Sequence, residues 1–220
     1  MDDTSNRRQL SVRETGAAQK TARWLSQKSI TPNQISLTSV VFALLGFMCL
    51  VGYRYSHLSL LLIMSAAFIQ LRLLCNLFDG MVAVEGGKKT AVGELFNDLP
   101  DRIADPLFIV GAGFVTHGGN EWLGWLCALL AVLTAYIRIL GVSMGCPADF
   151  QGPMAKQHRM AILTVILIIM FIATLFNAPA SITGSLMTAT LYLMLIGMLV
   201  TCFNRILGIL KYKSEDGENA

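Results

Sequence analysis

The chain has 220 residues, of which 54% are hydrophobic and only 14% are charged, and its mean hydropathy is +0.58. Soluble domains carry about 25% charged residues, so this composition excludes an ordinary soluble domain and indicates a membrane protein. The formal net charge is +3, and no block of basic residues is typical of nucleic-acid binding, so we expect no nucleic-acid partner.

Residues 1–30 are polar and basic, and they lack the short apolar core and small-residue cleavage site of a signal peptide. We interpret them as a cytoplasmic arm that is disordered at its start. The second half of the arm, Thr15–Lys28, predicts a short amphipathic helix on the membrane surface, with Trp24 toward lipid and Lys20 toward the headgroups.

Six apolar stretches follow, each long enough to span hydrocarbon as a helix, which takes about 20 residues. They are Ile35–Tyr53, Leu58–Val84, Gly93–Thr116, Trp122–Gly145, Met160–Phe176 and Thr183–Leu210. Just before the first, Thr31 and Gln34 predict a helix start with a capping box, with Pro32 at the first helical position. We therefore predict an all-α membrane protein with six transmembrane helices and a short N-terminal juxtamembrane helix. In this reading residues 31–212 form the membrane domain and 213–220 a disordered tail.

Lysine and arginine residues predict the orientation of these spans. The two termini and the loops on their side hold most basic residues, including Lys88, Lys156 and Arg159, whereas the opposite loops offer only Arg54. The positive-inside rule therefore predicts that both termini are cytoplasmic.

Polar side chains gather in the cytoplasmic parts of the second and third spans. A charged side chain at a helix centre in lipid costs about 2.5–3.5 kcal/mol, so such groups face the bundle interior, a wet cavity or a metal. Asn76 and Asp79 are three residues apart, which places them on one helical face. Asn97, Asp101 and Asp105 repeat every four residues, again on one face.

The two spans are joined by a cytoplasmic loop, so we expect them to be antiparallel neighbours whose polar faces meet just inside the cytoplasmic surface. Oxygen ligands gathered in this way suit a hard cation, Mg²⁺ or Mn²⁺. Gly80 and Gly93 remove side chains beside the cluster, so that a bulky ligand could approach the backbone.

An internal network of salt bridges is the alternative. Arg72 lies two turns deeper than Asp79, where it could reach Asp105. Arg138 lies in the fourth span, too deep for a topology signal, and could pair with Asp98 or Asp105. Lys156 and Arg159 could hold phosphate oxygens. Alternatively, they are ordinary basic residues of the cytoplasmic side, as the positive-inside rule predicts.

The spacing resembles the signature of the CDP-alcohol phosphotransferases, membrane enzymes of phospholipid synthesis. Their pattern is D-x-x-D-G-x-x-A-R, eight residues, then G-x-x-x-D-x-x-x-D. The chain has Asn76-x-x-Asp79-Gly80-x-x-Ala83-Val84, eight residues, then Gly93-x-x-x-Asn97-x-x-x-Asp101. The resemblance extends to "TPNQIS" before the first span and "GPMAKQHRM" entering the fifth. The chain departs from the pattern at Asn76, Asn97 and Val84, which suggests a variant branch.

The resemblance implies a reaction in which an acceptor hydroxyl displaces CMP from a CDP-linked alcohol, usually CDP-diacylglycerol. It implies that Asn76, Asp79, Asn97 and Asp101 bind metal, Mg²⁺ or Mn²⁺, and that Asp101 is the general base. It also implies that Asp79, Gly80, Ala83 and Gly93 contact CDP, and that Arg138, Lys156 and Arg159 bind phosphate or the acceptor. Dimers are usual in the family, so a homodimer is expected.

The asparagines change the charge of the expected metal site. An amide oxygen can coordinate Mg²⁺ but brings no charge, so Asp79 and Asp101 supply two negative charges where the family pattern has four. A second metal then needs another anion, either the substrate diphosphate or the nearby Asp98 and Asp105.

The leading interpretation is a CDP-diacylglycerol-dependent phosphatidyltransferase of a bacterial-type inner or plasma membrane, with its active site on the cytoplasmic side. Its partners would be CDP-diacylglycerol, an alcohol acceptor and membrane lipids; the acceptor is open among glycerol phosphate, inositol phosphate, serine and other headgroups. The alternative is a catalytically impaired relative that acts as a lipid- or nucleotide-binding membrane subunit. A small ion transporter is a third reading, but it would place its charges near mid-bilayer.

Overall fold

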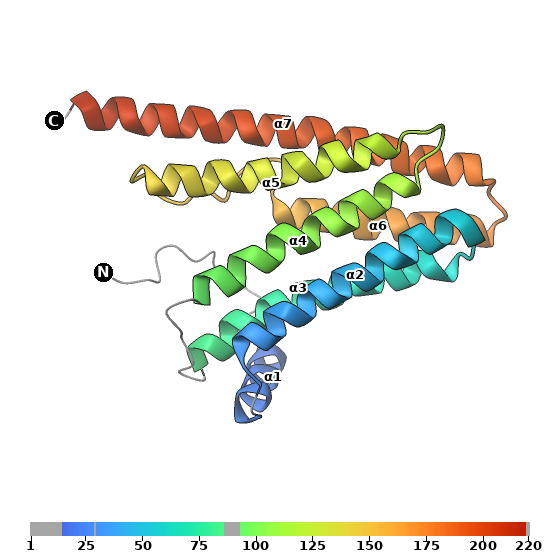
Figure 1. The fold of residues 1–220 in the computed structure, drawn as a ribbon, viewed down its shortest axis with the longest axis horizontal. Helices are drawn as coiled ribbons and strands as arrows, with labels where there is room; N and C mark the ends of the chain where they lie inside the picture. The colour runs from blue at the N-terminus through green and yellow to red at the C-terminus, as the bar shows by residue number, and fades with distance from the viewer. Residues whose placement is uncertain (1–14, 29, 86–92, 219–220) are drawn as a thin grey trace.

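A computed structural model describes residues 15–28, 30–85 and 93–218 (Figure 1). Over these residues the chain forms α1 (Gly16–Gln27), α2 (Pro32–Ser56), α3 (Leu60–Glu85), α4 (Gly93–Phe114), α5 (Glu121–Ser143), α6 (Lys156–Leu175) and α7 (Ala180–Glu218). The predictions for the start of the arm and for Lys88 lie outside the described residues.

The predicted surface helix is present as α1, and it lies across the end of the bundle where α2 begins and α3 ends (Figure 1). Ala18 and Ala22 are buried against Leu77 and Met81 of α3. Their small side chains let the helix approach closely. On another face of α1, Trp24 stays 55% exposed.

The start of α2 confirms the predicted capping box. The backbone N–H of Gln34 donates to the hydroxyl oxygen of Thr31 at 3.2 Å, and the backbone N–H of Thr31 donates to Oε1 of Gln34 at 3.0 Å. Pro32 occupies the first helical position. The two hydrogen bonds satisfy N–H groups that the helix itself cannot pair. Pro32 has no N–H group and so needs no partner.

Five of the described helices are long and apolar enough to cross a membrane: α2, α3, α5, α6 and α7. Large apolar side chains on their outer faces, such as Leu129, Ile196 and Phe203, are exposed, as lipid contact requires. The helix α4 lies within the same bundle, but its first half carries several charged residues, so it does not qualify by composition (Figure 1). The membrane protein is thus all-α as predicted, and the count of six spans stays a prediction.

The expected disordered tail from residue 213 is wrong for residues 213–218, because α7 continues to Glu218. Lys211 and Glu215 form an i,i+4 ion pair of 3.9 Å on this extension. Pairs of this kind support an exposed helix by a few tenths of a kcal/mol.

The two helices that carry the polar residues, α3 and α4, touch each other less than expected. Instead α2 packs along both of them, α4 packs on α5, and α5 packs on α7. A Cβ added to Gly113 of α4 would lie 2.8 Å from the Cα of Gly124 of α5, so these helices meet backbone to backbone. Polar side chains bridge the wider gap between α3 and α4 at one end of the bundle.

Candidate functional site

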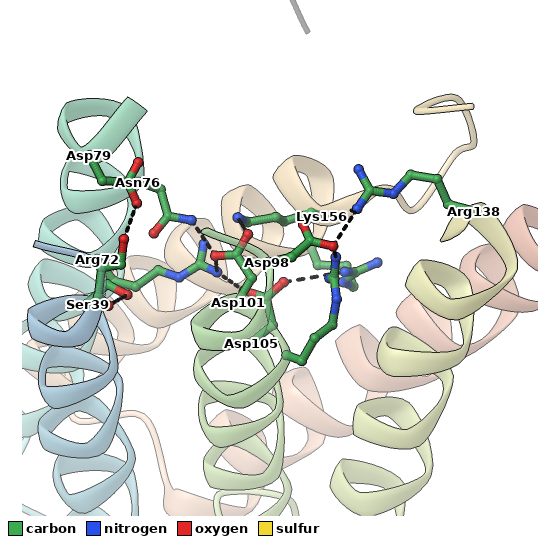
Figure 2. A network of polar contacts seen from close by, with 12 residues as sticks. Ser39, Arg72, Asn76, Asp79, Asp98, Asp101, Asp105, Arg138 and Lys156 are labelled. Atoms are coloured by element: carbon green, nitrogen blue, oxygen red, sulfur yellow. Dashed lines mark hydrogen bonds and ion pairs between the residues drawn. The ribbon is translucent and has the colours of Figure 1, made fainter. Parts of the chain in front are cut away.

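Asp101 on α4 is the centre of a polar network that joins three helices (Figure 2). Its side chain is contacted by Arg72 of α3, whose Nη2 lies 2.7 Å from Oδ1, and by the amide nitrogen of Asn76. Its other oxygen, Oδ2, is paired with the ammonium group of Lys156 at the start of α6. Asp101 is 7% exposed, so donors from the protein surround a buried carboxylate.

Asp105 lies one turn deeper and holds a second set of ion pairs. Nη2 of Arg72 is 2.6 Å from Oδ1 of Asp105, which confirms the alternative pairing expected from the sequence. Nη2 of Arg159 is 3.4 Å from Oδ2, and Arg159 also donates to the carbonyl oxygen of Met154 at 2.9 Å. Arg159 is therefore a buried cation that ties α6 to α4, rather than a surface topology charge.

Asp79 on α3 is held separately. The hydroxyl group of Ser36 on α2 donates to its Oδ2 at 2.7 Å. Its Oδ1 is buried and has no hydrogen-bond partner among the residues that the structure describes. Buried polar atoms in native proteins nearly always have partners, so this unpaired carboxylate oxygen is a candidate position for a ligand. The contact with Ser36 was not predicted, although this serine is the last residue of "TPNQIS".

At the rim of the site, Asp98 pairs with two arginines. Nη2 of Arg138 lies 3.1 Å from its Oδ2, and Nη2 of Arg102 lies 3.2 Å from the same oxygen. The guanidinium carbon of Arg138 is 5.0 Å from the ring centroid of Phe150, a cation–π contact that also positions it. Of the two partners considered for Arg138, the structure thus selects Asp98.

A cavity of about 250 Å³ opens between these groups. Its polar and charged lining residues are Asn76, Asp98, Asp101, Arg102, Thr134, Arg138, Lys156, Gln157, Arg159 and Arg205. Five of them are basic and two are acidic, so the cavity suits an anionic ligand. Arg205 was not predicted; it donates from Nη2 to the carbonyl oxygen of Gln151 at 3.1 Å.

The structure brings some of the predicted site residues together and leaves others apart. Asn76, Asp101, Arg138, Lys156 and Arg159 all line the cavity, whereas Asp79, in the described part of the chain, does not. Of the four residues expected to contact CDP, Asp79, Gly80 and Ala83 lie in the last two turns of α3, and Gly93 begins α4.

The predicted four-residue metal site is only partly visible. The side chains of Asn97 and Val84 lie outside the described part of the structure. Within the described ranges, no three His, Cys, Asp or Glu side chains are grouped to hold a metal ion. The site composed of Asn76, Asp79, Asn97 and Asp101 therefore stays a prediction.

An all-helical bundle with apolar outer faces defines a polytopic membrane protein, and the cavity at one end has the basic lining that suits an anion. Residues 29–211 match the family model of the CDP-alcohol phosphatidyltransferases, so the chain belongs to this family of membrane transferases of phospholipid biosynthesis. This confirms the resemblance drawn from the motif.

Solved structures of phosphatidylinositol phosphate synthase (PgsA1) of Mycobacterium tuberculosis have the same fold. The form with CDP-DAG bound has a TM-score of 0.70 and 19% identity, covering 87% of this chain and 92% of that one. The complex with manganese and citrate has a TM-score of 0.70 and 19% identity, covering 87% and 88%. "Inner membrane protein YnbA" of Escherichia coli K12 is 27% identical over 136 residues; the match covers 62% of this chain and 66% of that protein.

Among the described residues of the site, one carboxylate oxygen is open to a divalent ion. Asp79 offers an unpaired, buried carboxylate oxygen, the kind of ligand that Mg²⁺ and Mn²⁺ prefer. Asp101 is different, because each of its oxygens already contacts a donor from the protein. The amide group of Asn76 that faces Asp101 must be its NH₂, since an ionised carboxylate cannot donate a hydrogen bond.

Proposed function

We propose that the protein transfers the phosphatidyl group of CDP-diacylglycerol to the hydroxyl group of an alcohol, with release of CMP. The observation that carries this proposal is the buried carboxylate of Asp101 in the wall of a cavity with five basic side chains. The basic side chains suit the diphosphate, and the carboxylate suits the reacting hydroxyl, so the reaction needs both kinds of group side by side. The family membership and the intact spacing from Asp79 to Asp101 support it.

Charge stabilisation of the leaving CMP would come from the basic side chains and from a divalent ion, Mg²⁺ or Mn²⁺. Asp79, through its open Oδ1, and Asp101, through the second lone pair of Oδ2, would hold the ion, which would supply positive charge to the diphosphate. The basic residues Arg138 and Lys156, in the cavity wall, would hold phosphate oxygens of the donor or of an anionic acceptor. Gly80 and Gly93, which have no side chains, would let the nucleotide approach the backbone.

Asp101 would accept the proton of the acceptor hydroxyl as general base. Arg72 and Asn76 hold Oδ1 of this carboxylate, so its direction is fixed before substrate binds. A base that is already oriented lowers the entropy cost of reaching the reacting geometry.

We further propose that residues 31–212 form the catalytic domain, that the site faces the cytoplasm of an inner or plasma membrane, and that the protein is a homodimer. The basic residues at the same end of the bundle as the cavity support this orientation.

The test uses purified protein in lipid nanodiscs with CDP-diacylglycerol, Mg²⁺ or Mn²⁺, and a panel that contains glycerol phosphate, inositol phosphate and serine. CMP release and the mass of the new lipid are measured. We expect one acceptor to give product and the Asp101→Asn variant to lose at least 100-fold in rate, the range of general-base catalysis. Glu121→Gln is the matched control, because Glu121 pairs with Arg54 at 3.7 Å at the opposite end of the bundle. Equal CMP release by Asp101→Asn and wild type would remove Asp101 from the mechanism.

A second candidate is a relative that binds the CDP-lipid without turning it over. It is favoured by one observation: both oxygens of Asp101 are engaged by protein donors, which leaves less freedom to take a proton. In that case the protein binds CDP-diacylglycerol, and no acceptor in the panel releases CMP.

A further inference from the structure

We propose that the ammonium group of Lys156 takes the place of one metal ion, so that this site binds a single divalent ion per chain together with the CDP-lipid. The inference rests on the proposed function, because the diphosphate is needed to bring the ion in. It concerns how this chain compensates for asparagine at two positions where the family pattern has aspartate.

The charged side chains in and beside the cavity already give the site a positive charge without any metal. The acids are Asp79, Asp101 and Asp105, and the bases are Arg72, Lys156, Arg159 and Arg205, so positive charges exceed negative ones by one. A diphosphate diester carries two negative charges, which one divalent ion neutralises. A second ion would leave two further positive charges uncompensated in a buried place, and such charges are strongly unfavourable.

Lys156 is placed to act as a fixed cation beside Asp101. Its ammonium group pairs with Oδ2 of the carboxylate, and its side chain is 29% exposed in the wall of the cavity. It can therefore contact Asp101 and an anion in the cavity at the same time. Arg72 contacts the other oxygen, so Asp101 has a positive partner on each side.

Asn76 acts as a donor in this arrangement. Its NH₂ group points at Oδ1 of Asp101, whereas an aspartate at the same position would repel that carboxylate. Asparagine at position 76 is thus consistent with a site in which protein cations and an amide surround Asp101. The open carboxylate oxygen is on Asp79, and this is where one ion fits.

The experiment counts bound Mn²⁺ by electron paramagnetic resonance on the full chain in nanodiscs. Free Mn²⁺ is titrated with and without CDP-diacylglycerol. We expect weak binding alone, and one ion per chain at saturation with the CDP-lipid. Two ions per chain at saturation, or binding that the CDP-lipid does not change, would overturn the inference.

Variants test the part assigned to Lys156. Lys156→Gln removes one positive charge beside the site, so we expect Mn²⁺ binding without CDP-lipid to tighten by about tenfold or more, from the Coulomb term between neighbouring charges. Lys156→Arg keeps the charge and is expected to match wild type. Lys211→Gln is the control, since Lys211 is exposed on the far extension of α7. Equal Mn²⁺ affinity in the Lys156→Gln and Lys211→Gln variants refutes the role of Lys156.

A combined variant, Asn76→Asp with Lys156→Gln, restores one carboxylate and removes the competing cation. We expect this protein to bind a second Mn²⁺ with the CDP-lipid, and a count that stays at one contradicts the charge argument. CMP release separates this result from the proposed function. For the wild-type protein, two bound ions together with CMP release would overturn only the single-ion inference, whereas one bound ion without CMP release would overturn only the transfer reaction.

Discussion

Replacing Asp105 by asparagine removes a buried negative charge while keeping the shape of the side chain. Asp105 is 2% exposed, and it pairs with Arg72 at 2.6 Å and with Arg159 at 3.4 Å. Both arginines are almost fully buried, so they cannot turn to water when the partner loses its charge. Removing one member of a buried ion pair costs about 3–5 kcal/mol, because the remaining charge is left uncompensated.

We expect the Asp105→Asn variant to lose about 3 kcal/mol or more of its free energy of unfolding. Arg72 keeps Asp101 as a second partner, which places the expected loss toward the lower end of the range. The free energy is measured by denaturant titration of the purified protein in mixed micelles, followed by circular dichroism.

The matched control is Asp98→Asn. The side chain of Asp98 is 39% exposed, and exposed or half-exposed pairs contribute about 0–1 kcal/mol. The reasoning is refuted if Asp105→Asn unfolds within 1 kcal/mol of wild type, or if the two variants are equally destabilised. Either result would mean that water or another group reaches the two arginines.

Two further predictions use the same unfolding measurement. Thr31→Ala removes the side chain of the capping box and is expected to cost about 1 kcal/mol; no change would show that α2 does not depend on its cap. Gly113→Ala puts a Cβ 2.8 Å from the Cα of Gly124, so backbones must separate, and we expect a loss of about 1–3 kcal/mol. Gly208→Ala is its control, because a Cβ there meets nothing within 4 Å and alanine favours a helix. If the two alanine variants are equally stable, the close contact of α4 and α5 does not contribute to the free energy of unfolding.

Local sequence was sufficient wherever the contacting groups are close in the chain. The capping box of Thr31 and Gln34 spans three residues, so the motif itself contains both partners. The surface helix over residues 16–27 also follows from a local amphipathic pattern. The C-terminal segment is an exception, because residues 213–218 were expected to be disordered and instead continue α7. The helix propensity of this short polar segment and its connection to a long helix account for the difference.

Contacts between helices could be predicted only in part. The pair of Arg72 and Asp105 follows from helical faces and depth, because both residues lie at similar height on helices joined by one loop. The partner of Arg138 was left open between Asp98 and Asp105, which lie about two turns apart on one face of α4. The axial position of α5 along α4 decides between them, and the periodicity of the sequence does not contain that offset.

The sequence by itself determined that this is a helical membrane protein with carboxylates and amides on two helical faces at one end of the bundle. Composition, period and motif spacing carry that information, and each is local. Only the tertiary structure decided that Ser36 holds Asp79, that Lys156 and Arg72 flank Asp101, and that Arg205 reaches the cavity. These contacts join residues tens of positions apart, and they depend on how far each helix slides and turns against its neighbours, which is set by packing of the whole bundle.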